Sequence, residues 1–149
     1  MMISTKGRYA LRVMIELSAD YGNGYVALKD IARRQCISEK YLEAIMKKLV
    51  QDGLVAGMRG KGGGYQLAKA PEDCAVGEIL RATEQSLAPV ACLERDTNDC
   101  PRKGKCATLP MWKELNELIE GYFDGISLAQ LTAQAREIEG KIGAELDLI

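Results

Sequence analysis

The order of apolar residues and turns in residues 28–68 constrains the fold more than any other feature of this sequence. A short helix is predicted from Leu28, where apolar residues recur three and four positions apart. A second helix is predicted from Ser38, whose hydroxyl suits the free N–H groups at a helix start. Ala32 lies where the two helices approach closely, and Cys36 lies at the tight turn between them. The spacing therefore predicts a helix-turn-helix.

Two strand-like segments follow directly, at residues 54–58 and 65–68. The run between them contains four glycines, and glycines permit the backbone conformations of a tight hairpin turn. A hairpin at this place is typical of the wing of a winged helix. Its turn carries Arg59 and Lys61, which we expect to reach phosphates, with Arg59 also able to enter a minor groove.

The remaining predicted elements are helices, so the predicted fold class is mostly α-helical with a small β-hairpin wing. They are expected over residues 5–20, 75–86, 110–122 and 128–140. The first has an apolar stripe that includes Tyr9, and the last begins with a capping box from Ser127 to Gln130. The tail after residue 140 is weakly specified and is expected to be partly disordered.

The net charge of −1 conceals a strong asymmetry between the two halves of the chain. Residues 1–70 carry 12 Lys+Arg and 6 Asp+Glu, whereas residues 71–149 carry 8 and 15. A basic half indicates a nucleic-acid partner, although simple attraction between the halves would give the same asymmetry. The polar face of the second helix offers donors and acceptors for base edges and phosphates in a major groove: Ser38, Lys40, Tyr41, Glu43 and Lys47.

Several classes of protein are disfavoured by what the sequence lacks. It has no histidine, which excludes Ser-His triads, His-ligated zinc and His general bases, and it has no G-x-S-x-G nucleophile elbow. We therefore expect no enzyme. No run approaches the about 18 apolar residues of a membrane helix, and the N-terminal residues lack the apolar core of a signal peptide. We expect a cytoplasmic protein with no membrane partner.

Three of the five cysteines lie in the aperiodic segment 87–108, with the spacing C-x7-C-x5-C: Cys92, Cys100 and Cys106. Four Lys and Arg residues surround them, and nearby cations favour the ligating thiolate. Structural disulfides are rare in the cytosol, and three thiolates in one flexible loop can gather an iron–sulfur cluster or a zinc ion. The spacing is wider than the CxxC pairs typical of zinc ribbons, so an iron–sulfur cluster is favoured over zinc, redox-active thiols or no function. Cys36 and Cys74 are isolated, and each is expected to be a small buried hydrophobe.

Several motifs in chain order resemble the IscR-like winged-helix regulators, bacterial transcription factors that sense iron–sulfur status. The match extends from residue 1 to about residue 140. The motifs are Ser4-Thr5-Lys6-Gly7-Arg8-Tyr9-Ala10, Ile37-Ser38, Tyr41-Leu42-Glu43, Gly53-Leu54-Val55, the glycine run from Arg59 to Tyr65, Val76-Gly77-Glu78-Ile79 and the three-cysteine segment.

The resemblance implies a DNA-binding transcriptional regulator, a repressor, that senses cluster status and controls iron–sulfur cluster assembly genes. It implies a winged-helix domain at residues 1–70, and a cluster-binding loop (87–108) with dimerisation helices in residues 71–149. The partners would be double-stranded promoter DNA and a second copy, packed along the helix at about 110–122. The three loop cysteines match the cluster ligands, with [2Fe–2S] favoured over [4Fe–4S]. Matches to DNA-contacting positions are Ser38, Tyr41, Glu43 and the wing residue Arg59.

The resemblance leaves the fourth cluster ligand open. Leu109 stands where IscR-like relatives carry histidine, and Arg8 stands where some nitric-oxide-sensing relatives use aspartate. The candidates are a group from the partner subunit, a small thiol, or one of three nearby carboxylates: Glu94, Asp96 and Asp99. Two alternative functions also remain, a metal-independent repressor that responds to a metabolite or partner enzyme, and a small iron–sulfur redox protein.

Overall fold

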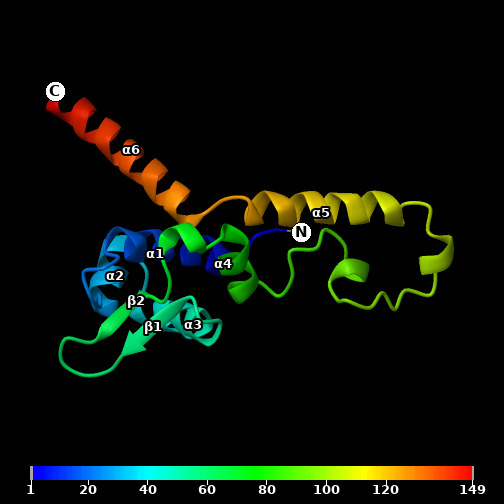
Figure 1. Ribbon diagram of the computed structural model, residues 1–149, viewed down its shortest axis with the longest axis horizontal. Coiled ribbons are helices and arrows are strands. Elements are labelled where there is room, and N and C mark those ends of the chain that lie inside the picture. The colour runs from blue at the N-terminus through cyan, green and yellow to red at the C-terminus, as the bar shows by residue number, and fades with distance from the viewer. Residues whose placement is uncertain (1, 149) are drawn as a thin grey trace.

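The computed structural model describes residues 2–148 as a helical body from which two helices extend (Figure 1). The elements are α1 (Thr5–Ala19), α2 (Leu28–Gln35), α3 (Glu39–Gln51), β1 (Val55–Met58), β2 (Gly64–Leu67), α4 (Val76–Thr83), α5 (Leu109–Asp124) and α6 (Leu128–Asp147). The two strands form one antiparallel hairpin. This architecture confirms the predicted fold class, mostly α-helical with a β-hairpin wing.

The turn between α2 and α3 has the expected helix-turn-helix geometry. Cys36 caps the end of α2 with φ 54°, and Ile37 N donates a hydrogen bond to Ala32 O at 3.0 Å. Ser38 is the N-cap of α3, and its side chain accepts a bond from Tyr41 N at 3.2 Å. Cys36 is exposed, so the prediction that it is a buried hydrophobe was wrong. Its left-handed backbone serves the turn, and its side chain lies on the surface.

The wing is a short, tightly specified hairpin. Val55 pairs with Leu67 and Met58 pairs with Gly64 at its two ends. Gly60 and Gly62 have φ of +94° and +77°, a region that side chains other than glycine rarely adopt, so they permit the turn. Val26 adds a further antiparallel bridge to Tyr65, which fixes the hairpin to the segment before α2.

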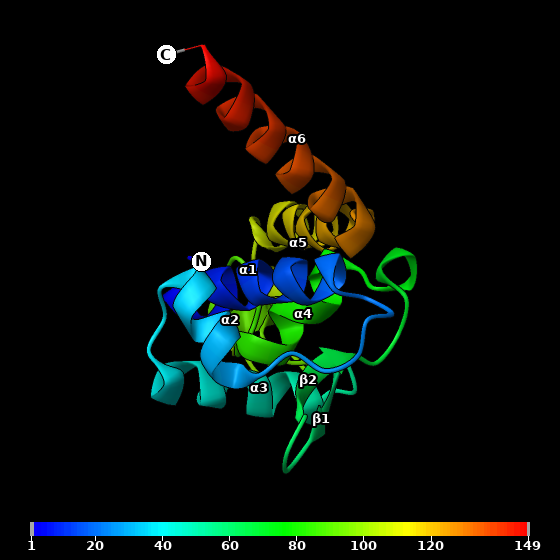
Figure 2. The same ribbon diagram turned by 90° about the vertical axis from the view of Figure 1, so that its left-hand side faces the viewer.

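The larger hydrophobic core is built around α1, which lies between α6 and the layer of α3 and the wing (Figure 2). It joins buried residues from α1, α2 and α3 to residues well beyond position 70, among them Cys74, Ile79 and Leu128. Cys74 is buried, as predicted. A buried hydrogen bond from Thr132 Oγ1 to Ser18 Oγ, at 2.8 Å, fastens α6 to α1. The helix-turn-helix, the wing and the start of α6 therefore share one core.

A second, smaller cluster connects the body to α5 and to the start of the cysteine loop. Val76, Leu80 and Leu87 are buried there, and partly buried residues of α5 and of the N-terminal segment pack against them. The loop itself, residues 87–108, contains two short 3-10 helices at Ala91–Leu93 and Lys103–Lys105. It reaches to the far end of α5, away from the body (Figure 1).

The last helix is longer than predicted. The capping box forms, since Ser127 and Gln130 exchange hydrogen bonds, but α6 continues to Asp147 instead of ending near residue 140. The segment contains no proline, and its helix-favouring residues outweigh two interior glycines. Within residues 2–148, no helix combines the length and the apolar character needed to cross a membrane.

Candidate DNA-binding surface and cysteine loop

The helix α3 presents one face to the core and the opposite face to solvent. Leu42, Ile45, Met46 and Leu49 are buried. Of the residues predicted to contact DNA, all those on α3 and its cap are exposed except Tyr41: Ser38, Lys40, Glu43 and Lys47. The exposed face therefore combines hydroxyl, ammonium and carboxylate groups, which can donate to and accept from base edges.

Tyr41 is half-buried and is held by α1. Its ring lies 5.9 Å from the ring of Tyr9 in an edge-to-face arrangement. The guanidinium of Arg12 lies 5.0 Å from the centroid of the Tyr9 ring, and Arg12 Nε donates to Gln35 Oε1 at 3.1 Å. Tyr9 was assigned from the sequence to an apolar stripe, and no signal in the spacing indicated that it orients Tyr41.

A hollow of about 690 Å³ lies between α3 and the wing and brings several predicted residues together. Glu43 and Lys47 line it from α3, and Arg59 lines it from the hairpin. Lys61 is exposed at the turn but does not line this hollow, and neither do Ser38, Lys40 and Tyr41. The residues predicted to contact DNA thus form two sets, one in the hollow and one at the start of α3, and Lys61 lies apart from both at the wing turn.

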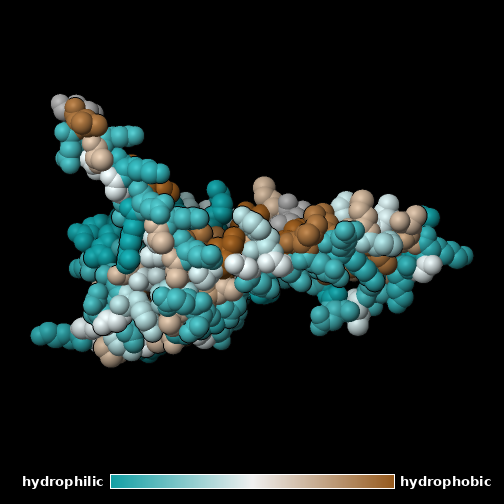
Figure 3. Space-filling model, turned by 45° about the horizontal axis from the view of Figure 1, so that its top comes forward, coloured by the Kyte–Doolittle hydropathy of each residue, from teal (hydrophilic) through white to brown (hydrophobic). Residues whose placement is uncertain are grey.

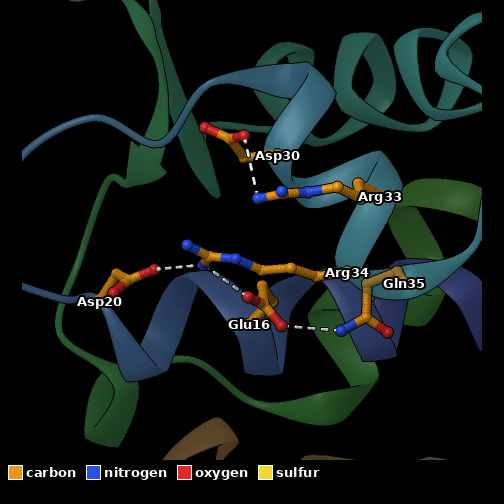
Figure 4. A network of polar contacts seen from close by, with 6 residues as sticks. All are labelled: Glu16, Asp20, Asp30, Arg33, Arg34 and Gln35. Atoms are coloured by element: carbon orange, nitrogen blue, oxygen red, sulfur yellow. Dashed lines mark hydrogen bonds and ion pairs between the residues drawn. The ribbon is translucent and has the colours of Figure 1, made fainter.

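Two arginines at the end of α2 are occupied by contacts inside the protein (Figure 4). Arg34 donates to Glu16 at 2.8 Å and to Asp20 at 3.3 Å, and the hydrogen bond to Glu16 contributes most to raising the pKa of Arg34. Gln35 Nε2 also donates to Glu16, at 2.8 Å. These contacts bind the end of α2 to α1. Arg33 pairs with Asp30 at 3.4 Å, but this exposed pair contributes little to stability.

The three loop cysteines are partly exposed and free of disulfides. Cys92 and Cys100 line one hollow of about 300 Å³, together with Glu94 and Asp99. Cys106 does not line it, and its Sγ lies 3.5 Å from Thr108 Oγ1. The hydrogen bond with the Thr108 side chain is the main cause that lowers the pKa of Cys106, and Arg102 adds to the effect.

The cysteine loop has the ligand types of a metal cluster, but its side chains are not gathered around one point. Among residues 2–148, no three Cys, Asp or Glu side chains are placed closely enough to hold one metal ion. The donor set nevertheless suits thiolate chemistry, because three unpaired thiols and several carboxylates share one segment near cations. Residues 101–105, between Cys100 and Cys106, contain one turn of 3-10 helix and no α-helix or strand.

The sequence matches a known family of regulators over most of its length. The model of the Rrf2 family, described as iron-dependent transcriptional regulators, matches residues 3–134. The chain is 39% identical over 131 residues to the HTH-type transcriptional regulator IscR of Aliivibrio salmonicida (strain LFI1238). The aligned residues cover 88% of this chain and 77% of the relative.

Two solved structures have a closely similar fold. IscR of T. potens superposes with a TM-score of 0.72 and 37% identity, covering 93% of this chain and 90% of that one. CymR, described as the global cysteine regulator of B. subtilis, superposes with a TM-score of 0.73 and 34% identity, covering 90% and 98% of the two chains.

Proposed function

The chain belongs to the Rrf2 family of iron-dependent transcriptional regulators, and we propose that it is a repressor whose DNA binding depends on an iron–sulfur cluster held by its cysteine loop. The observation that carries this proposal is the loop itself: three free, partly exposed thiols on an arm continuous with the DNA-reading body. The genes controlled would be those of cluster assembly, as the IscR-like resemblance implies.

On DNA, α3 would enter the major groove and the wing would contact the adjacent backbone. Glu43 can accept a hydrogen bond from a cytosine amino group, and Lys47 can donate to phosphate or base oxygens. Arg59 and Lys61 would contact phosphates, and Arg59 would also be able to enter a minor groove. The hollow between α3 and the wing supports this arrangement, because it puts Glu43, Lys47 and Arg59 on one concave surface.

The cluster ligands would be the thiolates of Cys92, Cys100 and Cys106, with [2Fe–2S] favoured over [4Fe–4S]. Glu94 and Asp99 line the hollow that contains two of these cysteines, whereas Asp96 does not. This favours an oxygen atom of Glu94 or Asp99 as the fourth ligand. When bound, the cluster would supply a redox-sensitive and labile centre, whose lability the oxygen ligand affects.

Cluster binding is tested by anaerobic reconstitution of Cys92→Ala, followed by visible absorption and acid-labile sulfide measurements. We expect the variant to lose the visible chromophore while its far-ultraviolet circular dichroism is retained, because Cys92 lies outside both cores. Cys36→Ser is the matched control, since it removes an exposed thiol outside the loop. A fully coloured Cys92→Ala protein would show that Cys92 is not a ligand.

The regulatory step is tested by comparing DNA binding by cluster-loaded and cluster-free wild type. The probe is a duplex that the wild-type protein selects from a random-sequence library. We expect the affinity or the preferred sequence to differ between the two forms. Identical binding of every duplex by both forms would refute cluster-dependent regulation.

A homodimer is proposed from the surface of α5. Four large apolar residues recur along it at three- and four-residue spacing and are exposed, with Leu118 at 65% and Tyr122 at 67%: Met111, Leu115, Leu118 and Tyr122. The space-filling view shows hydrophobic side chains along the part of the molecule that α5 forms (Figure 3). A continuous exposed apolar stripe of this kind marks a protein interface, and we assign it to α5 of a second copy.

The dimer is tested by light scattering on Leu118→Glu, which places a charge in the middle of this stripe. We expect a monomer that keeps its helical content. Lys113→Glu introduces the same side chain away from the stripe and is expected to stay dimeric. A dimeric Leu118→Glu protein would move the interface elsewhere.

The alternative function is a metal-independent repressor that responds to a metabolite or partner enzyme. The similarity to CymR, described as a global cysteine regulator, favours a metabolite as the signal in that case. A variant with Ser at all three loop cysteine positions separates the two functions. A full regulatory response from that variant would favour the alternative, and loss of the response would favour cluster sensing.

A further inference from the structure

The residue that ends α4, three positions before the cysteine segment begins, is bound to the start of α1. Glu84 caps the end of α4, with its backbone N–H donating to Leu80 O at 2.8 Å. Its carboxylate oxygen Oε1 accepts two hydrogen bonds from Ser4, one from the backbone N at 3.0 Å and one from Oγ at 2.6 Å. Ser4 is in turn the N-cap of α1, since its Oγ accepts a bond from Gly7 N at 3.1 Å. Residues 80 positions apart thus share one short chain of hydrogen bonds.

Gly7 is matched to this contact. It is buried in the first turn of α1, where glycine costs helix stability relative to alanine. A Cβ atom built on Gly7 would overlap Glu84 Oε1, and it would lie 3.2 Å from Glu84 Cδ. The absence of a side chain at position 7 therefore lets the carboxylate approach the helix start, where the helix dipole also favours a negative charge.

The same region joins the loop to the DNA-reading surface. Leu87, at the start of the loop, is buried in the cluster against which Ile3 packs. A hollow of about 830 Å³ is lined by Glu84 and the following loop residues on one side, and by Lys6 and Tyr41 on the other. Tyr41 contacts Tyr9, which lies five residues after Ser4, the residue that Glu84 holds. A change at the start of the loop can therefore reach α3 through the first two turns of α1.

We propose that the Ser4–Glu84 contact couples the cysteine loop to DNA binding, and we call this contact the joint. Through it the loop sets the position of the first turn of α1 and of Tyr41, and thereby the affinity for DNA. Glu84 is a positioning residue in this account, because it acts through Ser4 and does not touch DNA. The proposal rests on the proposed function for its DNA ligand. It concerns this chain's own residues, so it applies to cluster-free protein as well.

The coupling can be measured without metal, because linkage is reciprocal. If the loop affects DNA binding, then DNA must affect the loop. The readout is the rate of iodoacetamide alkylation of Cys92 in reduced, cluster-free protein, followed by peptide mass spectrometry with and without the selected duplex. We expect DNA to change this rate by about fivefold in wild type and by less than about twofold in Glu84→Ala. Glu84→Gln keeps an oxygen acceptor for both Ser4 donors and should retain the wild-type response.

A double-mutant cycle on DNA affinity tests the geometry separately. Gly7→Ala in wild type should weaken DNA binding because its methyl group displaces the Glu84 carboxylate. In the Glu84→Ala background, Gly7→Ala should cause no further loss of DNA affinity. Glu84→Ala removes the two Glu84 atoms nearest to the new methyl group, and the remaining neighbour is the flexible Ile3 side chain at 3.2 Å. Melting temperatures of all variants identify any that are unfolded.

The outcomes separate this proposal from the proposed function. A wild-type response in Glu84→Ala, no response in wild type, or additive losses in the cycle would each overturn the joint. Loss of the response in both Glu84 variants would overturn the hydrogen bonds as its cause. Equal DNA binding by cluster-loaded and cluster-free wild type would instead refute cluster sensing, while the labelling result would still decide the joint.

Discussion

Replacing Arg59 with alanine should remove one phosphate contact per wing from the DNA complex. Arg59 is exposed at the start of the hairpin turn, and Gly60 and Gly62 next to it let the backbone turn sharply. Among residues 2–148, no ion pair joins Arg59 to a carboxylate. Its charge is therefore available to DNA without breaking an internal contact.

The expected magnitude follows from counterion release. Each phosphate contact to duplex DNA adds about 0.9 to the slope of log affinity against log salt concentration. Losing one contact should reduce the slope by about 0.9 per wing, or by about 1.8 for a dimer that uses both wings. Between about 50 and 200 mM salt, the affinity ratio of wild type to variant should then shrink about 3.5-fold per wing. Weakening should be similar across DNA sequences, because phosphates carry no base identity.

Fluorescence anisotropy titrations over a salt series measure these slopes. Arg34→Ala is the matched control, because Arg34 is engaged by Glu16 and Asp20 and should leave the slope unchanged. Equal slopes for wild type and Arg59→Ala would refute the phosphate contact of the wing. A changed slope in Arg34→Ala would show that the internal ion pairs open on DNA.

Two further predictions concern the packing that supports this surface. Burial raises the pKa of the Cys74 thiol to about 11. At pH 8, iodoacetamide should therefore alkylate the exposed Cys36 in the native protein and leave Cys74 unmodified until guanidinium is added. Equally fast labelling of both cysteines in the native protein would contradict this burial. Burial acts to raise the pKa of Glu78, but hydrogen bonds from Lys69 and the Ala75 N–H outweigh it and hold the pKa below its ordinary value of 4.5. A depressed carboxyl pKa contributes stability above the ordinary value and loses it as the pH falls through the folded value. Urea unfolding of Glu78→Gln should therefore lose less stability than wild type on acidification below pH 4.5, and parallel acid profiles would refute this role.

Much of the fold could be predicted because its signals are local. The hydroxyl of Ser38 caps α3, and Ser127 with Gln130 forms the capping box of α6, through bonds between residues three positions apart. The glycines of the wing have the positive φ angles that a tight turn requires. Spacing alone also placed three cysteines in one segment, since chain proximity does not depend on folding.

Side-chain exposure and pairing were less predictable. Cys36 and Cys74 are both isolated in the sequence, yet one is exposed at a turn and the other is buried. Arg34 and Arg59 both belong to the basic half, yet only Arg34 is neutralised by α1. The difference arises because tertiary packing decides which side chains meet. The spacing of residues along one helix does not indicate which side chains of another element will lie against it.

The amino-acid sequence by itself determined where helices and turns begin, because caps, apolar periods and glycine conformations act within one or two turns of the chain. Only the tertiary structure decided that Tyr9 orients Tyr41 and that Gly7 makes room for the carboxylate of Glu84. Those contacts join residues that are far apart in sequence, and they exist only because the shared core packs α4 and α3 against α1.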